Sequence, residues 1–441
     1  MKYHIITLGC QMNMSDNERV RAVLDEKLGY QWTDDEKEAQ LIGIIACSVR
    51  QKAIDKVYSL INKWNKRKDN EVLITFLTGC ILPFDKTKFL KLFDIVFSMS
   101  ELPKLPEVLG NYGVTSPVSY ALHQIKIPER IKQFWDITPE YQSDWQAFIP
   151  IQNGCDKFCT YCAVPFTRGR EISRDSEDIL SELKNLVDRG YKSITLLGQN
   201  VNSYGRDKRG EEITFAQLLE KVGAYGLESG RDFWVYFTSP HPQDMTDDVL
   251  EAIAKYPNLA KQIHIPLQSG DDVMLKRMNR SHDMKKYHYI IQSIRNILPQ
   301  ATIFTDIIVG FTDESDQEFE NTRKAMHDFK FNMAYIAQYS PRPGAKSSKW
   351  EDNIPKAVKK ERYHQLTEDL MEHSFAYNKE MVGKDYTVIV TGKDRKKGYL
   401  TSLTEGRIIV RFKSDDEQLI GNFTKVRITS AAQFSTEGSL I

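Results

Sequence analysis

The sequence predicts an α/β protein in three parts: a parallel, doubly wound sheet, an open partial barrel of six strand–helix units, and a small all-β barrel. Strand-like apolar runs alternate with helical patterns over the first 100 residues, and a second such series begins at residue 147. From residue 381, short β-branched runs are separated by Gly, Asp and Lys turns instead. We expect the parts to span residues 1–140, 141–378 and 379–441.

Four apolar runs define the expected N-terminal sheet: YHIITLG, LIGIIAC, EVLITFLTGC and FDIVFSM. Ser15 and Glu18 have capping-box spacing before a helical pattern that stops near Gly29, and a second helix is expected from about Val49 to Asn65. This βαβαβ order predicts parallel strands with helices on both faces. Residues 101–146, with five scattered prolines and weak periodicity, are expected to be a linker that wraps between the parts.

Six further runs predict the strands of the central part: QAFIPIQ, SITLLGQ, FWVYFTS, QIHIPLQ, ATIFTDIIVGF and NMAYIAQYS. The helical patterns that separate them cover residues 176–189, 214–225, 244–256, 271–298 and 315–329. Six units are two short of a closed eightfold barrel, which predicts a partial one. A long amphipathic helix is expected over residues 357–380, before the all-β part.

Bulk composition is that of a soluble protein: 41% of the 441 residues are hydrophobic and 27% are charged. The apolar stretches, such as residues 302–311, are too short to cross a bilayer. The start, MKYHIITLGC, lacks the features of a signal peptide. We therefore expect a cytoplasmic protein without membrane contact. With 60 basic and 60 acidic residues, the net charge of zero excludes a protein that coats nucleic acid, so any RNA contact must use local patches.

Three of the six cysteines, Cys10, Cys47 and Cys80, each stand at the carboxyl end of one of the first three expected strands. Ligands bind beyond those ends in open α/β sheets, so we expect these thiols to converge on one edge. In a reducing compartment, metal binding or catalysis is a better explanation than a disulfide framework. The alternative for each of them is a buried core cysteine.

The other three cysteines form the motif Cys155-x3-Cys159-x2-Cys162, directly after the first barrel strand. Three thiolates can hold three irons of a [4Fe–4S] cube and leave the fourth iron without a protein ligand. That iron can bind the amino and carboxylate groups of S-adenosylmethionine (SAM), whose reductive cleavage releases a 5′-deoxyadenosyl radical. Zinc is the alternative, but a structural zinc site would need a fourth Cys or His, and the sequence offers none nearby.

Several longer motifs extend this pattern along nearly the whole chain. They are GCQMNMSDNE (9–18), CSVRQKA (47–53), KFCTYCAVPFTRGRE (157–171), LLGQNVNSYG (196–205), IPLQSGDDVMLKRMNR (265–280), DIIVGF (306–311) and YSPRPG (339–344). With them, the chain resembles the methylthiotransferases of the radical-SAM superfamily, and among these the MiaB type, which modifies isopentenylated adenosine in tRNA. The resemblance implies a flavodoxin-like N-terminal domain, a radical-SAM barrel and an RNA-binding TRAM domain.

The resemblance also implies a function. Cys10, Cys47 and Cys80 would hold an auxiliary [4Fe–4S] cluster, beside the SAM cluster on Cys155, Cys159 and Cys162. One SAM would methylate a sulfide on the auxiliary cluster, and the radical from a second SAM would remove the hydrogen from adenine C2. The product would be the 2-methylthio derivative of N6-isopentenyladenosine at position 37, next to the anticodon. The expected partners are the tRNA anticodon stem-loop, an electron donor such as flavodoxin or ferredoxin and a sulfur source, and the protein is expected to be a monomer.

Two other functions stay open. The same chemistry could act on N6-threonylcarbamoyladenosine or on an aspartate of a ribosomal protein, although Gln11-Met12-Asn13 and Ser48-Val49-Arg50 argue against both. A non-catalytic, zinc-containing RNA-binding protein is the alternative from a different class. Three departures from the family pattern, at Ile45-Ala46, at Thr312-Asp313 and in ILPFD after Cys80, bear on access around the auxiliary cluster and on turnover.

The expected SAM contacts stand at strand ends. Gly198, Gln199 and Asn200 end the second barrel strand, where Gly permits close approach and the amides can donate. Gln268 and Ser269 end the fourth strand and could reach the ribose. Arg280 could bind the SAM carboxylate or be a surface arginine, and Asp306 could bind SAM or be a packed polar residue.

Other polar residues have weaker signals. We expect structural or substrate-shaping roles for His241 and His264, because a radical abstraction needs no general base at its first step. Two basic groups could contact RNA phosphates or be solvated surface: Arg168, Arg170 and Arg174 after the cluster motif, and Lys393, Arg395, Lys396 and Lys397 in the all-β part.

Overall fold

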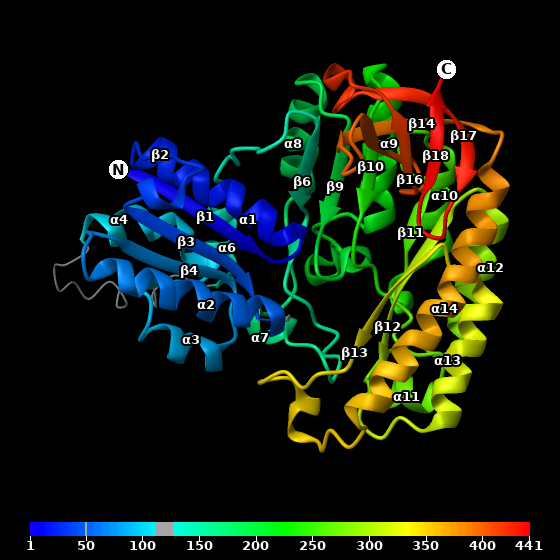
Figure 1. Cartoon of the computed structure of the whole chain (residues 1–441), viewed down its shortest axis with the longest axis horizontal. Helices are drawn as coiled ribbons and strands as arrows, with labels where there is room; N and C mark the ends of the chain where they lie inside the picture. Colours follow the sequence, from blue (N-terminus) through cyan, green and yellow to red (C-terminus); the bar gives the residue numbers. More distant parts are fainter. Residues whose placement is uncertain (49–50, 112–126) are drawn as a thin grey trace.

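The computed structural model describes residues 1–48, 51–111 and 127–441 (Figure 1). Val49 and Arg50, where the second helix was expected to begin, lie outside this part, as do residues 112–126 of the expected linker. The predicted three-part α/β architecture is confirmed. Figure 1 shows the N-terminal sheet on the left and the central barrel on the right, with the C-terminal barrel above it.

The N-terminal sheet is parallel and has the strand order β2-β1-β3-β4-β5, the flavodoxin-like order. Its strands are β1 (Lys2–Leu8), β2 (Gln31–Trp32), β3 (Leu41–Cys47), β4 (Ile74–Cys80) and β5 (Ile95–Val96). All seven residues of β3 are buried, as expected for a central parallel strand covered on both faces. The two-residue β2 was not predicted, and the fourth predicted strand is reduced to the two residues of β5.

Helices cover both faces of this sheet (Figure 1). They are α1 (Gln11–Ala22), α2 (Gln51–Lys68), α3 (Pro83–Phe89), α4 (Leu105–Gly110) and α6 (Ile127–Trp135). One hydrophobic cluster joins one face to α1, α4 and α6, and another joins the opposite face to α2 and α3. The linker prediction is wrong for α4 and α6, which bury Leu109, Phe134 and Trp135 in the first cluster, whereas residues 136–145 have no helix or strand and lead to β6.

The central part contains the six predicted strands in two parallel, three-stranded sheets, β6-β9-β10 and β11-β12-β13. Their bounds are Gln146–Pro150 (β6), Ser193–Leu197 (β9), Trp234–Phe237 (β10), Gln262–His264 (β11), Thr302–Val309 (β12) and Met333–Gln338 (β13). The main helices are α8 (Ser176–Asp188), α9 (Phe215–Ser229), α10 (Asp247–Lys255), α11 (Asp272–Arg277), α12 (Met284–Ile297), α13 (Asp316–Phe329) and α14 (Lys356–Met381). The single helix expected over 271–298 is therefore two helices, and Asn279 between them has a left-handed φ of 54°.

The cluster motif lies in a loop between the hairpin strands β7 (Gln152–Asn153) and β8 (Ile172–Ser173), with a short helix α7 (Val164–Thr167). This loop follows the carboxyl end of β6. In Figure 1 the arrowheads of β6, β9 and β10 point down toward the same side as α7.

The C-terminal part is a closed barrel with the strand order β14-β15-β16-β18-β17. Its strands are β14 (Asp385–Lys393), β15 (Tyr399–Thr404), β16 (Ile409–Lys413), β17 (Phe423–Ala431) and β18 (Thr436–Leu440). The β15–β16 turn docks at the amino ends of the central strands, where Thr302 Oγ1 donates to the Gly406 carbonyl at 2.7 Å. Among the helices of the described residues, none is long and apolar enough to span a membrane.

Candidate metal centres and active-site cavity

Cys10, Cys47 and Cys80 come together at the carboxyl edge of the N-terminal sheet, as the topology predicts. Cys10 caps α1 directly after β1, and Cys47 and Cys80 are register partners at the ends of β3 and β4. All three line one cavity of about 700 Å³. No disulfide forms among the six cysteines. Their role as ligands stays a prediction.

Polar side chains from two parts of the protein surround Cys80. Its Sγ accepts from Arg168 Nε at 3.0 Å and from Asn13 Nδ2 at 3.9 Å. The Oδ1 atom of Asn13 accepts from the Cys10 backbone N–H at 3.3 Å, so this amide connects two of the three cysteines. The Arg168 guanidinium also pairs with Asp16 on α1. The sequence motifs did not single out Asp16, because a charged residue on a helix usually faces water.

The Cys155 loop is held from both sides by backbone contacts. Gly154 has a φ of 81°, and a Cβ there would lie 2.0 Å from the Arg170 carbonyl oxygen, so only glycine fits. The Cys155 N–H donates to the Gly169 carbonyl at 3.2 Å. On the other side, the Thr160 N–H donates to the Met278 carbonyl at 3.0 Å, just after α11. The loop conformation is thus fixed by the protein itself.

Without a cation, the thiols of Cys80, Cys155 and Cys162 stay protonated at neutral pH. Burial raises the pKa of Cys155 to about 11 and that of Cys162 to about 12. The pKa of Cys80 is also raised, first by a hydrogen bond with Cys47 and second by burial. Bound iron would favour the thiolates.

Each trio supplies three soft donors, the set that suits an iron–sulfur cube. In the described part of the chain, no three His, Cys, Asp or Glu side chains converge on a single metal ion. The ligands of a cube each bind a different iron, so they need not share one ion. The donor sets therefore fit a cube.

Three of the expected SAM contacts, Gly198, Gln199 and Asp306, line the cavity. Gln199 Oε1 accepts from the Gly154 N–H at 2.6 Å, which ties the end of β9 to the cluster loop. Asn200 is buried and donates to Asp244 Oδ2 at 3.0 Å, and Asp244 also pairs with Lys157. Asn200 thus positions the loop instead of lining the cavity.

The two expected SAM contacts after β11, Gln268 and Ser269, do not line the cavity. Gln268 lines no part of the cavity in this structure, and its backbone, with a φ of 73°, bonds to β12 on both sides. Ser269 is fully buried, and its Oγ lies 3.3 Å from Thr322 Oγ1 of α13, so it packs a helix.

Arg280 is not a surface arginine. Its Nη2 donates to the Pro266 carbonyl at 2.9 Å, and Nη1 lies 3.6 Å from Cys159 Sγ. The buried Nε has no protein partner. A buried donor without a partner beside the cluster loop fits an acceptor on a bound ligand.

Asp306 and His264 face the cavity as a pair, with His264 Nε2 3.0 Å from Asp306 Oδ2. His241 is buried elsewhere near the loop, and burial lowers its pKa far below the ordinary value. The neighbouring His282 has its pKa lowered by burial to about 3. Both rings are therefore neutral at physiological pH, which agrees with structural roles.

The proposed phosphate contact by the arginines after the motif is wrong for two of the three. Arg168 is buried against Asp16 and Cys80, and Arg174 is buried against Glu182. Only the exposed Arg170 remains, paired with Asp156. Of the second group, Lys393 and Lys396 pair with acidic side chains, while Arg395 and Lys397 are exposed.

The C-terminal barrel contributes to the cavity through Arg407, which the sequence did not indicate. Arg407 lines the cavity, lies over the Tyr236 ring at 4.1 Å and donates to Thr195 Oγ1 at 3.2 Å. All three parts of the chain therefore border one space.

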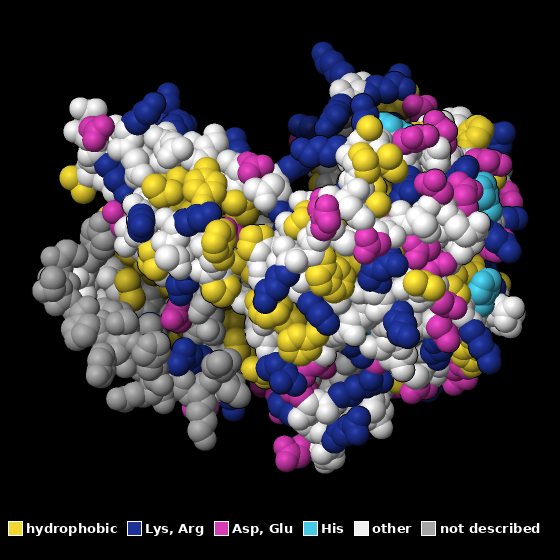
Figure 2. All heavy atoms as spheres, turned by 90° about the horizontal axis from the view of Figure 1, so that it is seen from below, with side chains coloured by type: hydrophobic (Ala, Val, Ile, Leu, Met, Phe, Trp, Pro, Cys, Tyr) yellow, Lys and Arg dark blue, Asp and Glu magenta, His cyan; other side chains and the backbone are white. Residues whose placement is uncertain are grey.

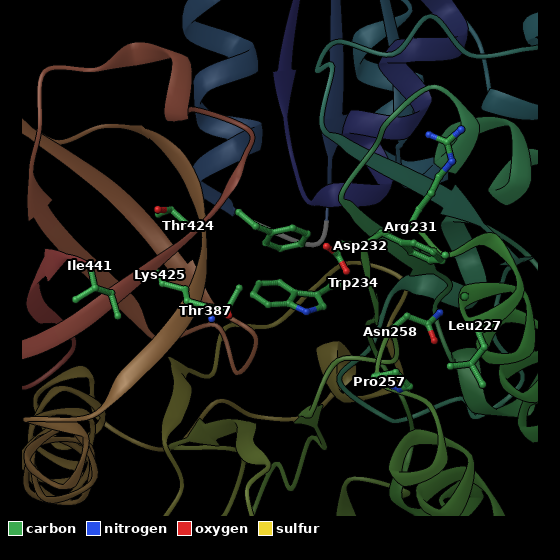
Figure 3. A pocket seen from close by; sticks show the side chains of 14 residues that line it. Leu227, Arg231, Asp232, Trp234, Pro257, Asn258, Thr387, Thr424, Lys425 and Ile441 are labelled. Carbon is green, nitrogen blue, oxygen red and sulfur yellow. The ribbon is translucent and has the colours of Figure 1, made fainter.

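A second cavity, of about 790 Å³, lies between α9, β10 and the C-terminal barrel (Figure 3). Figure 3 shows Trp234 between Thr387 and Lys425 of that barrel and Pro257 and Asn258. None of the expected ligand residues lines it. The smaller cavity is therefore the candidate active site.

The face at the carboxyl ends of the barrel strands carries exposed aromatic rings. Phe158 and Phe166 of the cluster loop are 43% and 46% exposed. Figure 2 views the molecule from this side and shows exposed hydrophobic side chains across the middle, with Lys and Arg nearby. Aromatic and basic groups together suit unstacked bases and phosphates.

Comparison with known proteins covers the three parts separately and together. The sequence matches the Radical SAM superfamily over residues 149–326, the Uncharacterized protein family UPF0004 over 2–99 and the TRAM domain over 379–441. It is 37% identical over 449 residues to proteins named tRNA-2-methylthio-N(6)-dimethylallyladenosine synthase from Yersinia pestis (strain Pestoides F) and Yersinia enterocolitica. Each alignment covers 100% of this chain and 92% of the relative.

Solved structures share the fold. The radical S-adenosylmethionine methyltransferase TsrM from Kitasatospora setae matches with a TM-score of 0.55 and 10% sequence identity, over 94% of this chain and 80% of that one. This likeness concerns the arrangement of the elements only.

Proposed function

Since the chain belongs to the family of tRNA-2-methylthio-N(6)-dimethylallyladenosine synthases, we propose that it adds a methylthio group to C2 of N6-isopentenyladenosine at position 37 of tRNA. The protein is a radical-SAM enzyme, so SAM and one [4Fe–4S] cluster are its cofactors. We assign this cluster to Cys155, Cys159 and Cys162, and a second one to Cys10, Cys47 and Cys80. We place the N-terminal domain at residues 1–140, the radical-SAM barrel at residues 141–378 and the TRAM domain at residues 379–441.

One observation carries the proposal: a single cavity is lined by one cysteine trio and by residues that contact the loop of the other trio. Cys10, Cys47 and Cys80 line it directly. Val164, whose N–H donates to Cys162 Sγ at 3.5 Å, and Gln199, which holds Gly154, line it from the other side. When bound, the cofactors would supply a carbon-centred radical and a transferable sulfur, which an unactivated aromatic C–H bond requires.

The residues of the chain would bind and enclose the base. A cavity of about 700 Å³ is large enough for a nucleoside that has left its stack. Gln199 and the His264–Asp306 pair offer polar groups to the base and ribose, and Arg407 closes the floor at the amino ends of the strands. Arg280, with its unpartnered Nε, is placed to bind the SAM carboxylate.

The anticodon stem-loop would bind at the open face, with the exposed Phe158, Phe166 and Arg170 of the cluster loop against its bases and phosphates and the TRAM domain on the backbone. Salt should weaken this binding steeply. We further propose an electron donor such as flavodoxin or ferredoxin, a separate sulfur source, and a monomeric enzyme.

The test is anaerobic reconstitution followed by mass spectrometry of tRNA nucleosides. We expect the 2-methylthio product on isopentenyladenosine, with 5′-deoxyadenosine formed alongside. Cys155→Ala should abolish 5′-deoxyadenosine, whereas Cys80→Ala should keep its formation and lose the methylthio product. Modification of threonylcarbamoyladenosine or of a ribosomal protein would reject the substrate, and a zinc-containing protein without SAM cleavage would reject the enzyme.

A further inference from the structure

One arginine connects the two cysteine loops. Arg168 caps α7, six residues after Cys162, and its Nε reaches Cys80 Sγ in the other domain at 3.0 Å. It lies 152 residues from Asp16 along the sequence, yet both guanidinium Nη atoms bond to that carboxylate.

Burial makes this link specific. The side chains of Arg168 and Asp16 are 4% and 1% exposed, so water does not screen their charges. The bidentate pairing uses the two Nη atoms and fixes the plane of the guanidinium. That plane aims the remaining donor, Nε, at Cys80. Asn13, which is completely buried, donates to Asp16 at 3.4 Å and supports the carboxylate from α1.

We propose that Arg168 is a positioning residue that ties the two cluster loops together and tunes the reduction potential of the cluster at Cys80. The inference rests on the proposed second cluster. A positive donor at a ligand sulfur stabilises the more negative, reduced form of an iron–sulfur cluster, so it raises the potential. Arg168 thus favours electron arrival at the auxiliary site, and it does so from the loop that carries the SAM cluster.

The same loop provides a matched control. Arg170 stands two residues further on, is 74% exposed and pairs with Asp156 in a similar fork. It has no contact to Cys10, Cys47 or Cys80 among its described interactions. An exposed pair of this kind contributes little to stability. Arg170→Met therefore removes the same charge from the same loop without changing the surroundings of Cys80.

The experiment is an EPR-monitored redox titration of the anaerobically reconstituted full chain, with iron analysis. Wild type and Arg170→Met should hold about eight irons per chain and share both potentials. Arg168→Met should show a lower potential for the auxiliary cluster and an unchanged one for the SAM cluster. Equal auxiliary potentials in Arg168→Met and wild type, with both clusters present, would overturn the inference.

Arg168→Met leaves Asp16 buried without a partner, which could cost several kcal/mol and the fold. The double variant Arg168→Met/Asp16→Asn removes both charges together; the loss of the hydrogen bond to Cys80 should still lower the auxiliary potential, by less than in Arg168→Met because a negative charge is lost as well. If either variant loses the cluster, Arg168→Lys decides: it keeps the charge but loses the fork and the N–H donor that the fork aims at Cys80 Sγ, so its auxiliary potential should fall below that of the wild type, and an unchanged value refutes the proposal. A wild type with about four irons would reject the second cluster itself, and the inference with it.

Discussion

Alanine substitutions at two glycines of the cluster loop would distinguish the cost of backbone strain from the cost of steric overlap. Gly154 and Gly169 have φ values of 81° and 82°, so alanine at either position adopts a left-handed conformation. That costs about 1–2 kcal/mol per residue. A Cβ at Gly169 meets nothing within 4 Å, whereas one at Gly154 would lie 2.0 Å from the Arg170 oxygen and 2.6 Å from the Gly169 oxygen.

The steric overlap decides how much stability Gly154→Ala loses. An ordinary carbon–oxygen contact is about 3.3 Å or longer, so in Gly154→Ala the loop beside Cys155 must move by about 1 Å. Overpacking of this kind adds about 1–3 kcal/mol, which gives about 2–5 kcal/mol in all. Gly169→Ala should cost only the conformational part. We therefore expect Gly154→Ala to destabilise the SAM-cluster loop selectively.

Iron analysis and SAM cleavage would measure this difference after anaerobic reconstitution. Gly154→Ala should retain about four irons per chain, those of the auxiliary cluster, and form little 5′-deoxyadenosine. Gly169→Ala should stay close to the wild type in both. Full iron content and normal SAM cleavage in Gly154→Ala would show that the loop tolerates the shift, and the steric reasoning would then be wrong.

Two further predictions concern the domain contacts. Burial raises the pKa of Glu18 to about 7 from 4.5. Between these two pH values the native state keeps a proton that the unfolded chain has lost, so the free energy of unfolding falls as the pH rises from 4.5 to about 7. Glu18→Gln should therefore be more stable than wild type by about 3 kcal/mol at pH 8, with little gain at pH 5; equal gains in urea unfolding at both pH values would contradict this. Arg407→Ala should lose the stacking on Tyr236, worth about 1–2 kcal/mol, and raise KM for tRNA roughly tenfold. Arg411→Ala, which removes a half-exposed arginine paired with Asp394 inside the C-terminal barrel, should not raise it, and equal KM values for the two variants would count against a role for Arg407.

The sequence predicted features that depend on local pattern. Strand periodicity gave the six barrel strands and the central strands of the first sheet, and the strand ends placed Cys10, Cys47 and Cys80 on one edge. It missed α4 and α6, because their few apolar residues show no period until the sheet they cover is known. Arg168 was expected to be an RNA contact or a solvated side chain, because its partner, Asp16, lies in another domain and no local pattern reports such a pair.

The helix α1 shows why the interface resisted prediction. Asp16, Glu18 and Arg19 are almost completely buried, although charged residues on a helix normally mark its solvated face. The charges meet partners across the domain boundary: Arg168 for Asp16, and Glu182 for Arg19. Buried pairs gain little net stability over apolar packing, but the loss of one partner is costly. Such an interface tolerates few alternative dockings, and the spacing between the two cysteine trios depends on that docking.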